Sequence, residues 1–372
     1  MAEQAQSISA AGFEQKKTAS TLNRIVRFSL VRAFMLFLAV VISVFLTIMI
    51  ANMGGYVDNI LRGEIRERLA LQLLSNQNYQ TMAPEARQEF LAKEIAQEEE
   101  RMGLNKPFAV RSVSFLKNAL TFNLGRAVNM TSDRGSRKVS EIILDRLPPT
   151  LLLMGTSNLI LFFAAIAVAL MLSRRYGTAL DKAVVALSPT SSAPPWFYGI
   201  FMIVIFAAFL KWLPFGGMIS SPPPETPLTY MLDVLKHMTL PVFSLIISAI
   251  FISIYNWRTF FMIYSSEDYV EMARAKGLSD RAIERKYILR PTLPAIVTNF
   301  SLLLIGIWTG AIITETVFQW PGIGRTTFQA IGLFDTPVIV GITIISAYLL
   351  AITVYLLEFV YAIVDPRVKV GG

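Results

Sequence analysis

The chain has 372 residues, of which 54% are hydrophobic and only 16% are charged. The apolar residues gather in runs of about 20, the length that crosses a bilayer, so the sequence predicts an integral membrane protein rather than a soluble domain. A net charge of +8 could indicate a nucleic-acid partner. Because the basic residues gather in short loops on one side of the predicted membrane, we expect the lipid bilayer as a partner and no nucleic acid.

The residue inventory also limits the possible chemistry. There is no cysteine, which excludes disulfides and thiol chemistry. The single histidine, His237, excludes a two-histidine metal site and leaves little for acid–base catalysis. The apolar runs contain no clustered carboxylates, so a membrane-embedded enzyme is the weaker hypothesis. We expect no catalytic residue, no metal site and no cofactor bound by this chain.

We predict an all-α polytopic fold with six membrane-spanning helices. Four basic residues between Lys16 and Arg27 precede the first apolar run, as they would in a signal peptide. The run is longer than a signal core and no small-residue cleavage site follows promptly, so we interpret it as a retained anchor. The predicted spans are residues 30–53, 149–172, 194–215, 239–262, 294–318 and 336–363.

The distribution of Lys and Arg predicts the orientation in the membrane. The N-terminal tail, Ser173–Lys182, Asn256–Pro294 and the C-terminus together hold 16 of these residues. The two short loops expected on the other side hold three. We therefore expect a multi-pass protein of the cell membrane with both termini in the cytoplasm.

Residues 54–148 form a long segment that we expect outside the cytoplasm, since long loops translocate despite their charge. Apolar residues recur at every fourth position over Leu61–Leu69 and predict a helix. A second helix is expected over Thr81–Gly103, with Pro84 in its first turn. The acidic run Glu98–Glu100 is interpreted as a solvated face.

The loop of residues 263–293, between the fourth and fifth spans, looks soluble although it separates two apolar runs. One of the serines at 265 and 266 is expected to cap a short helix, which Gly277 ends in the left-handed conformation. Ser279 is expected to cap a second helix that ends before Pro291. Small alanines would let another protein approach closely, and Tyr269 with Met272 would give it an adaptable apolar anchor. From the residues alone, an ordinary amphipathic connector fits about as well.

Motifs in this loop and beyond it resemble a known family. Glu271-Met272-Ala273, followed by Gly277, resembles the EAA loop of ABC importer permeases. The stretch Asp268–Leu278 is similar to the dipeptide, oligopeptide and nickel permease family. The Trp-Pro-Gly form at 320–322 resembles the B-type half of a heterodimer, and the resemblance covers most of the chain from about Gly103. Further matches, in the expected order, are Trp212-Leu213-Pro214, His237-Met238-Thr239-Leu240-Pro241, Glu315-Thr316-Val317-Phe318-Gln319-Trp320-Pro321-Gly322-Ile323-Gly324 and Asp365-Pro366-Arg367.

The chain also departs from the family pattern. Met272 replaces the second residue of the EAA motif, and Leu293-Pro294 lies farther from Gly277 than in the generic short pattern. Residues 1–28 and much of 54–102 have no assigned counterpart. The departures leave the expected coupling role intact and the role of the two extra segments open.

The resemblance implies a permease subunit of a binding-protein-dependent, inner-membrane ABC importer. It implies a second homologous permease subunit, two cytosolic ABC ATPase subunits that use ATP and Mg, and an extracytoplasmic solute-binding protein. This chain has no Gly-x-x-x-x-Gly-Lys-Ser/Thr loop, so hydrolysis is expected on the partner subunits. Peptides are the expected cargo, with oligosaccharides or nickel as alternatives. A non-transporting membrane scaffold is the alternative from another class.

Three groups of candidate functional residues follow from the resemblance and from polarity within the spans. Glu315 could equally be an interfacial carboxylate, either hydrated or paired with Arg325, and the polar pathway candidates could equally be hydrogen-bonded helix contacts. Glu358 is interpreted as an interfacial carboxylate. The ATPase-coupling group is Tyr269, Glu271, Met272, Ala273, Ala275, Lys276 and Gly277. The outer-gate or binding-protein group is Glu315, Trp320, Pro321, Gly322 and Gly324, and the possible pathway group is Asn158, Asn299, Ser301 and Trp308.

These expectations divide the chain into five parts. They are a cytoplasmic tail (1–29), the first span (30–53), the extracytoplasmic segment (54–148), a five-helix permease core (149–363) that contains the coupling loop (263–293), and a cytoplasmic C-terminus (364–372).

Overall fold

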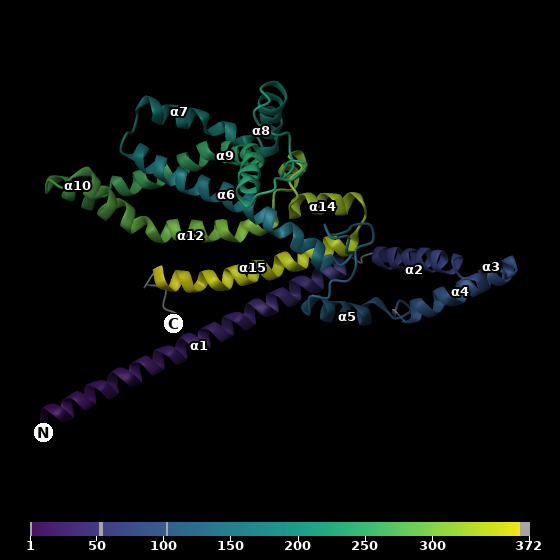
Figure 1. Cartoon of the computed structure of the whole chain (residues 1–372). Helices are drawn as coiled ribbons and strands as arrows, with labels where there is room; N and C mark the ends of the chain where they lie inside the picture. Colours follow the sequence, from purple (N-terminus) through teal and green to yellow (C-terminus); the bar gives the residue numbers. More distant parts are fainter. Residues whose placement is uncertain (1, 52–54, 102, 365–372) are drawn as a thin grey trace. The chain divides into compact units, whose positions relative to one another are not determined.

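The computed structural model describes residues 2–51, 55–101 and 103–364, and most of them are helical (Figure 1). Within these residues the β-structure is one isolated antiparallel bridge between Arg126 and Lys138. The all-α fold class is therefore confirmed. The elements are α1 (Ala2–Ala51), α2 (Tyr56–Leu74), α3 (Gln77–Gln80), α4 (Pro84–Arg101), α5 (Phe108–Leu120), α6 (Val139–Ser173), α7 (Ala179–Leu187), η2 (Ser188–Ser192), α8 (Pro195–Met202), η3 (Ile203–Phe209), α9 (Pro227–Ser265), α10 (Asp268–Ala275), α11 (Asp280–Ile283), η4 (Glu284–Leu289), α12 (Arg290–Gly306), η5 (Ile307–Thr309), α13 (Ile312–Val317), α14 (Ile323–Gly332) and α15 (Thr336–Val364).

In the part of the chain that the structure describes, five helices are long and apolar enough to cross a membrane, and the number is six if two helical segments that meet at a sharp bend are one span. The bend, of 98°, separates Ala179–Ser192 from Pro195–Phe209. The count agrees with the six predicted spans when this bent pair is taken as one. The five continuous stretches are Val26–Ile50, Val139–Ser173, Pro227–Ser265, Asp280–Gly306 and Thr336–Glu358.

The chain divides into two compact units. One, the core unit, comprises the start of α1, residues Leu147–Arg325 and the chain from Leu349. The other, the outer unit, comprises Leu38–Arg146 and Thr326–Tyr348. The outer unit therefore contains α2 to α5, which correspond to the long segment predicted between the first two spans.

At least four of the predicted spans have different bounds, and the second begins at Val139 rather than at 149. The third was predicted over 194–215, but its helix ends at Phe209. The fourth begins at Pro227 rather than at 239, because the Thr226 hydroxyl accepts from the Thr229 amide and caps the helix there. His237 consequently lies inside α9 instead of at the entrance of a span. The fifth was predicted to run to residue 318, but it ends at Gly306.

The outer unit confirms both helices predicted from local patterns and corrects one interpretation. Pro84 is the first residue of α4, and Ile65 is buried on the apolar stripe of α2. The Glu98–Glu100 run is not simply a solvated face, because two of its carboxylates reach across to α2. Arg68 pairs with Glu98 at 2.8 Å, and Arg62 pairs with Glu99 at 3.1 Å.

Two predicted features lie outside the described residues. They are the motif Asp365-Pro366-Arg367 together with the rest of the C-terminal tail after position 364, and residues 52–54, where the predicted first span ends and the predicted segment 54–148 begins.

A close approach between α8 and the end of α13 gives a test of the packing in the core unit. Gly199 faces the buried ring of Phe318, and a Cβ at this position would lie 2.7 Å from a ring carbon. We expect Gly199→Ala to destabilise the chain by about 1–3 kcal/mol, because overpacking a filled core forces its neighbours to move. The measurement is thermal unfolding of the purified chain in detergent.

The matched control is Gly155→Ala in the middle of α6, where no neighbouring atom lies within 4 Å of the added Cβ. Alanine is the better helix former, so this variant should be neutral or slightly more stable. Equal shifts in the two variants would contradict the predicted contact with Phe318.

Candidate functional site

The first helix of the coupling loop is α10, and its start differs from the prediction. Helix α9 continues to Ser265, and Glu267 occupies the N-cap position of α10, so neither Ser265 nor Ser266 caps it. The end is as predicted, because Gly277 adopts the left-handed conformation with φ of 73°. Glycine is suited to this position since it has no Cβ to clash there.

One face of α10 is buried in the chain's own core. Val270 is 0% exposed and Ala273 is 2% exposed. Both belong to an apolar cluster that includes Phe261 of α9, Ile288 of η4 and Ala169 of α6. The expectation that Ala273 offers a surface to another protein is therefore wrong in this structure. A small side chain at 273 lets α10 approach its own core instead.

The rest of the α10 surface is exposed and presents two large side chains. Met272 is 57% exposed and Tyr269 is 37% exposed. The ring of Tyr269 stacks on that of Tyr287, with centroids 6.5 Å apart. Burial and the nearby Glu267 raise the pKa of Tyr269, so its hydroxyl remains protonated at neutral pH. Glu271, Ala275, Lys276 and Gly277 are also exposed, so six of the seven predicted coupling residues are exposed.

The second helix of the loop does not end before Pro291, contrary to the prediction. Ser279 occupies the N-cap of α11 as predicted, although its side chain makes no capping hydrogen bond. The helix then widens to a π-helix over Glu284–Leu289 and continues through Pro291 and Pro294 as α12. The π-helical turns shift the hydrogen-bond register ahead of the prolines, which lack the N–H of an ordinary helical turn. The Thr292 hydroxyl donates to two carbonyls there.

Two ion pairs, neither of them predicted, hold the elements around the coupling loop. Asp181 of α7 pairs with Arg258 of α9, and both side chains are buried. The Arg258 guanidinium also lies 5.3 Å from the Tyr176 ring centroid. Arg174, just after α6, pairs with Glu284 of η4 at 2.8 Å. The partners of each pair are far apart in sequence, so local periodicity carried no signal for them.

The chain turns at Gly310, just after the end of the fifth span, and Glu315 accepts hydrogen bonds from the backbone around this break. Glu315 is 0% exposed. Its Oε1 accepts from the Ala311 amide and from the Thr150 hydroxyl, each at 3.3 Å, and its Oε2 accepts from the Arg325 amide at 3.0 Å. The acid thus joins the starts of α13 and α14 to α6. A carboxylate is favourable at these helix N-termini, where free amides point outward.

The Glu315 environment corrects two interpretations. It is neither an accessible interfacial carboxylate nor a partner of the Arg325 side chain, because the Arg325 guanidinium donates to the Gln319 carbonyl at 2.6 Å. A Cβ at Gly310 would lie 2.7 Å from Glu315 Oε1, and one at Gly322 would clash with Oε2. The glycines let the backbone close around the acid.

The Trp-Pro-Gly motif is buried rather than on the surface. Trp320 is 0% exposed, and its Nε1 donates to the carbonyl of Pro149 at 2.9 Å. Gly322 and Gly324 are buried as well, and Pro321 is half-buried. Trp320 is therefore not accessible to a docked protein in this structure. This group, with Thr150 and Glu315, is called the break cluster below.

The polar pathway candidates mostly bond within the helices. Asn158 and Asn299 each donate to a carbonyl four residues earlier, and the Trp308 indole donates to the Thr353 hydroxyl at 2.8 Å. Ser301 is buried, and its hydroxyl has no hydrogen-bond partner among the described residues. Glu358 pairs with Arg32 of α1, which makes it a helix contact.

The break cluster predicts that Glu315→Ala is strongly destabilising. The substitution leaves the Ala311 and Arg325 amides and the Thr150 hydroxyl without their acceptor, at a cost of about 1–3 kcal/mol for each buried unsatisfied group. Thermal unfolding in detergent measures the effect. Glu225→Ala, which removes an exposed carboxylate from a loop, should leave the unfolding temperature unchanged. A stable Glu315→Ala variant would show that these bonds do not hold the break together.

Comparison with known proteins places the chain in a family. Residues 162–370 match the model of the binding-protein-dependent transport system inner membrane component. The chain is 30% identical over 273 residues to the oligopeptide transport system permease protein AppB of Bacillus subtilis, covering 73% of this chain and 83% of that protein. It is 32% identical over 272 residues to a putative peptide permease protein of Brucella suis, covering 73% and 82%.

A third relative is the di/tripeptide transport system permease protein DppB of Pseudomonas aeruginosa, at 28% identity over 284 residues, covering 72% of this chain and 83% of that protein. The matched region contains the coupling loop and the break cluster except for Thr150. The chain therefore belongs to the family of inner membrane components of binding-protein-dependent transport systems.

Proposed function

We propose that this chain forms half of the translocation pathway of an ATP-driven importer for peptides. Its partners would be a second related permease, two cytosolic ATPase subunits and a solute-binding protein outside. Support for the peptide cargo comes from the relatives, which are named as oligopeptide, peptide and di/tripeptide permeases. ATP and Mg would be held by the ATPase subunits.

The observation that carries the proposal is the two-faced packing of α10. Its exposed face, with Tyr269 and Met272, would dock into an ATPase subunit, while Val270 and Ala273 fix the other face to the core. When the ATPase subunits close on ATP, a displacement of α10 would pass directly to Phe261 in α9. Rigid-body movement of packed helices of this kind is an ordinary way to change a gate.

The coupling loop would lie in the cytoplasm, and both chain termini would lie on the same side. The proposal rests on the excess of Lys and Arg in the predicted cytoplasmic segments. The helices α2 to α4 would then lie outside the cell membrane and steady the docked binding protein.

The break cluster would act as the joint of the outer gate rather than as a direct contact for the binding protein. Four of its predicted members, Glu315, Trp320, Gly322 and Gly324, are buried and inaccessible to a docked protein. A change in the angle between α12 and α14 would require the bonds of Glu315 to rearrange.

The coupling surface predicts that Met272→Glu releases the ATPase subunits. A charge at the centre of a desolvated interface costs several kcal/mol when it has no partner, so association should weaken by at least tenfold. Co-purification from solubilised membranes and the attached ATPase activity measure the effect. The chain's own unfolding temperature should stay the same, because Met272 is exposed.

The control is Met231→Glu, at a methionine that is 53% exposed near the other end of α9. It should retain the ATPase subunits. Full retention by Met272→Glu, or equal loss in both variants, would argue against docking through this face. Ala273→Arg is not a clean test, because it places a charge in the chain's own core.

Deletion of residues 57–102 tests the role of the outer helices. The deletion removes α2, α3 and α4. We expect weaker binding of the solute-binding protein and slower uptake, with the ATPase subunits still attached through α10. Unchanged binding-protein affinity and unchanged uptake would refute a role for these helices in docking.

A further inference from the structure

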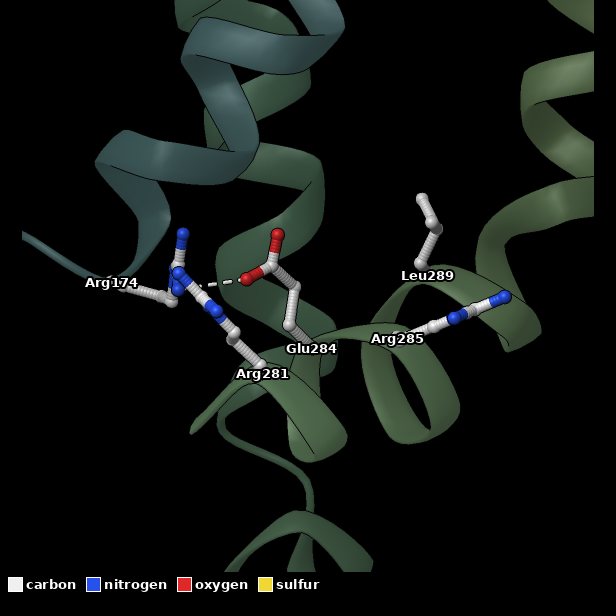
Figure 2. A pocket seen from close by; sticks show the side chains of 5 residues that line it. All are labelled: Arg174, Arg281, Glu284, Arg285 and Leu289. Carbon is white, nitrogen blue, oxygen red and sulfur yellow. Dashed lines mark ion pairs between the residues drawn. The ribbon is translucent and has the colours of Figure 1, made fainter. Parts of the chain in front are cut away.

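A pocket of about 420 Å³ lies next to the coupling loop (Figure 2). Its lining residues are Arg174, Arg281, Glu284, Arg285 and Leu289. Arg174 directly follows the last residue of α6, and the other four lie on α11 and η4. Helix α6 is the candidate span Val139–Ser173, and α11 and η4 form the start of the candidate span Asp280–Gly306. The pocket is therefore at the ends of two spans, where membrane and water meet.

The pocket carries an excess of positive charge. Three guanidinium groups face one carboxylate, and Glu284 pairs with Arg174. Neither Arg281 nor Arg285 forms an ion pair within the described part of the chain. Figure 2 shows Arg281 beside the paired Arg174 and Glu284, whereas the Arg285 side chain lies on the side of Leu289 and points away from them. Two positive charges are thus left to meet an anion from elsewhere.

The side chains that line the pocket indicate which kind of anion it would bind. Guanidinium groups bind phosphate oxygens through two parallel N–H donors, which makes arginine well suited to phosphate recognition. Leu289 adds an apolar wall that a free phosphate would not use but that the glycerol and first acyl carbons of a lipid would cover. Basic pockets between membrane helices on the cytoplasmic side are a known setting for anionic headgroups.

We propose that this pocket binds the phosphate headgroup of an anionic phospholipid of the cytoplasmic leaflet. The proposal rests on the proposed function in one respect, the placement of the coupling loop in the cytoplasm. An acidic surface of an ATPase subunit is the less suitable occupant, because the pocket is too small to accept a protein surface. The exposed face of α10 is the part of the loop that a protein partner can contact. The bound phosphate bridges Arg174 at the end of α6 to Arg281, with Arg285 adding positive charge at the Leu289 side of the pocket, and so ties the coupling loop to a second span.

The test uses the assembled transporter in nanodiscs made from neutral phosphatidylcholine and anionic phosphatidylglycerol, with native mass spectrometry to count the phosphatidylglycerol retained. Arg281→Ala with Arg285→Ala should weaken retention of one phosphatidylglycerol on the order of tenfold. The control pair, Lys286→Ala with Arg290→Ala, removes the same charge from exposed positions of the same segment that do not line the pocket. It should keep that lipid. Equal loss of phosphatidylglycerol in both double variants would show that the lipid binds a generally basic surface and not this pocket.

A variant with the opposite expected sign guards against misfolding. Glu284→Gln removes the only carboxylate of the pocket and frees Arg174, so phosphatidylglycerol should be held several-fold more tightly. Weaker retention in Glu284→Gln would overturn the proposal. If millimolar inorganic phosphate displaces the lipid, the site binds free phosphate instead. If the Arg281→Ala, Arg285→Ala variant loses the ATPase subunits in neutral lipid, the site belongs to the contact with the protein partner. Lipid retention does not depend on transport, so it can fail while the Met272→Glu result still supports coupling.

Discussion

The contact between α10 and the core is the interaction on which the coupling function depends. A helix of eight residues is too short to be stable alone, so it exists because Val270 and Ala273 are buried. The same burial makes α10 a mechanical part of the core unit. A partner that moves the exposed face must also move Phe261 and Ile288, which belong to segments that continue into two different spans.

The span that ends at Gly306 links this contact to the break cluster. At its coupling end the helix widens to a π-helix over Glu284–Leu289, and at its other end it tightens to a 3₁₀-helix over Ile307–Thr309. Between these irregular ends, α12 is α-helical and contains one internal proline, Pro294. A helix of this kind bends most easily at its irregular end turns and at the proline. Those ends are the places where the proposed function needs movement.

Features that depend on local backbone preferences could be predicted from the sequence, whereas contacts between residues far apart in the sequence could not. Gly277 and Pro84 were placed correctly because each residue has a backbone preference that acts within one turn. The direction of Ala273 could not be predicted, since a small residue suits a close approach by either a partner or the chain's own core. The pair Asp181–Arg258 joins residues that no sequence period connects. The helix stop predicted before Pro291 failed because a π-helical turn offset the missing amide.

The Trp-Pro-Gly motif shows how packing can bury a side chain whose type is common at the membrane interface. Tryptophan beside a predicted span end is typical of the membrane interface, where its indole N–H finds water. Trp320 is fully buried, and this is possible only because the Pro149 carbonyl replaces that water as the acceptor. The glycines around it reflect how closely backbone must approach the Glu315 carboxylate. A buried acid surrounded by glycines near a span break is therefore better explained as an acceptor that holds helix ends together than as an exposed contact. The explanation requires that the donor amides belong to more than one helix. The amides of Ala311 and Arg325, which both donate to Glu315, meet this requirement.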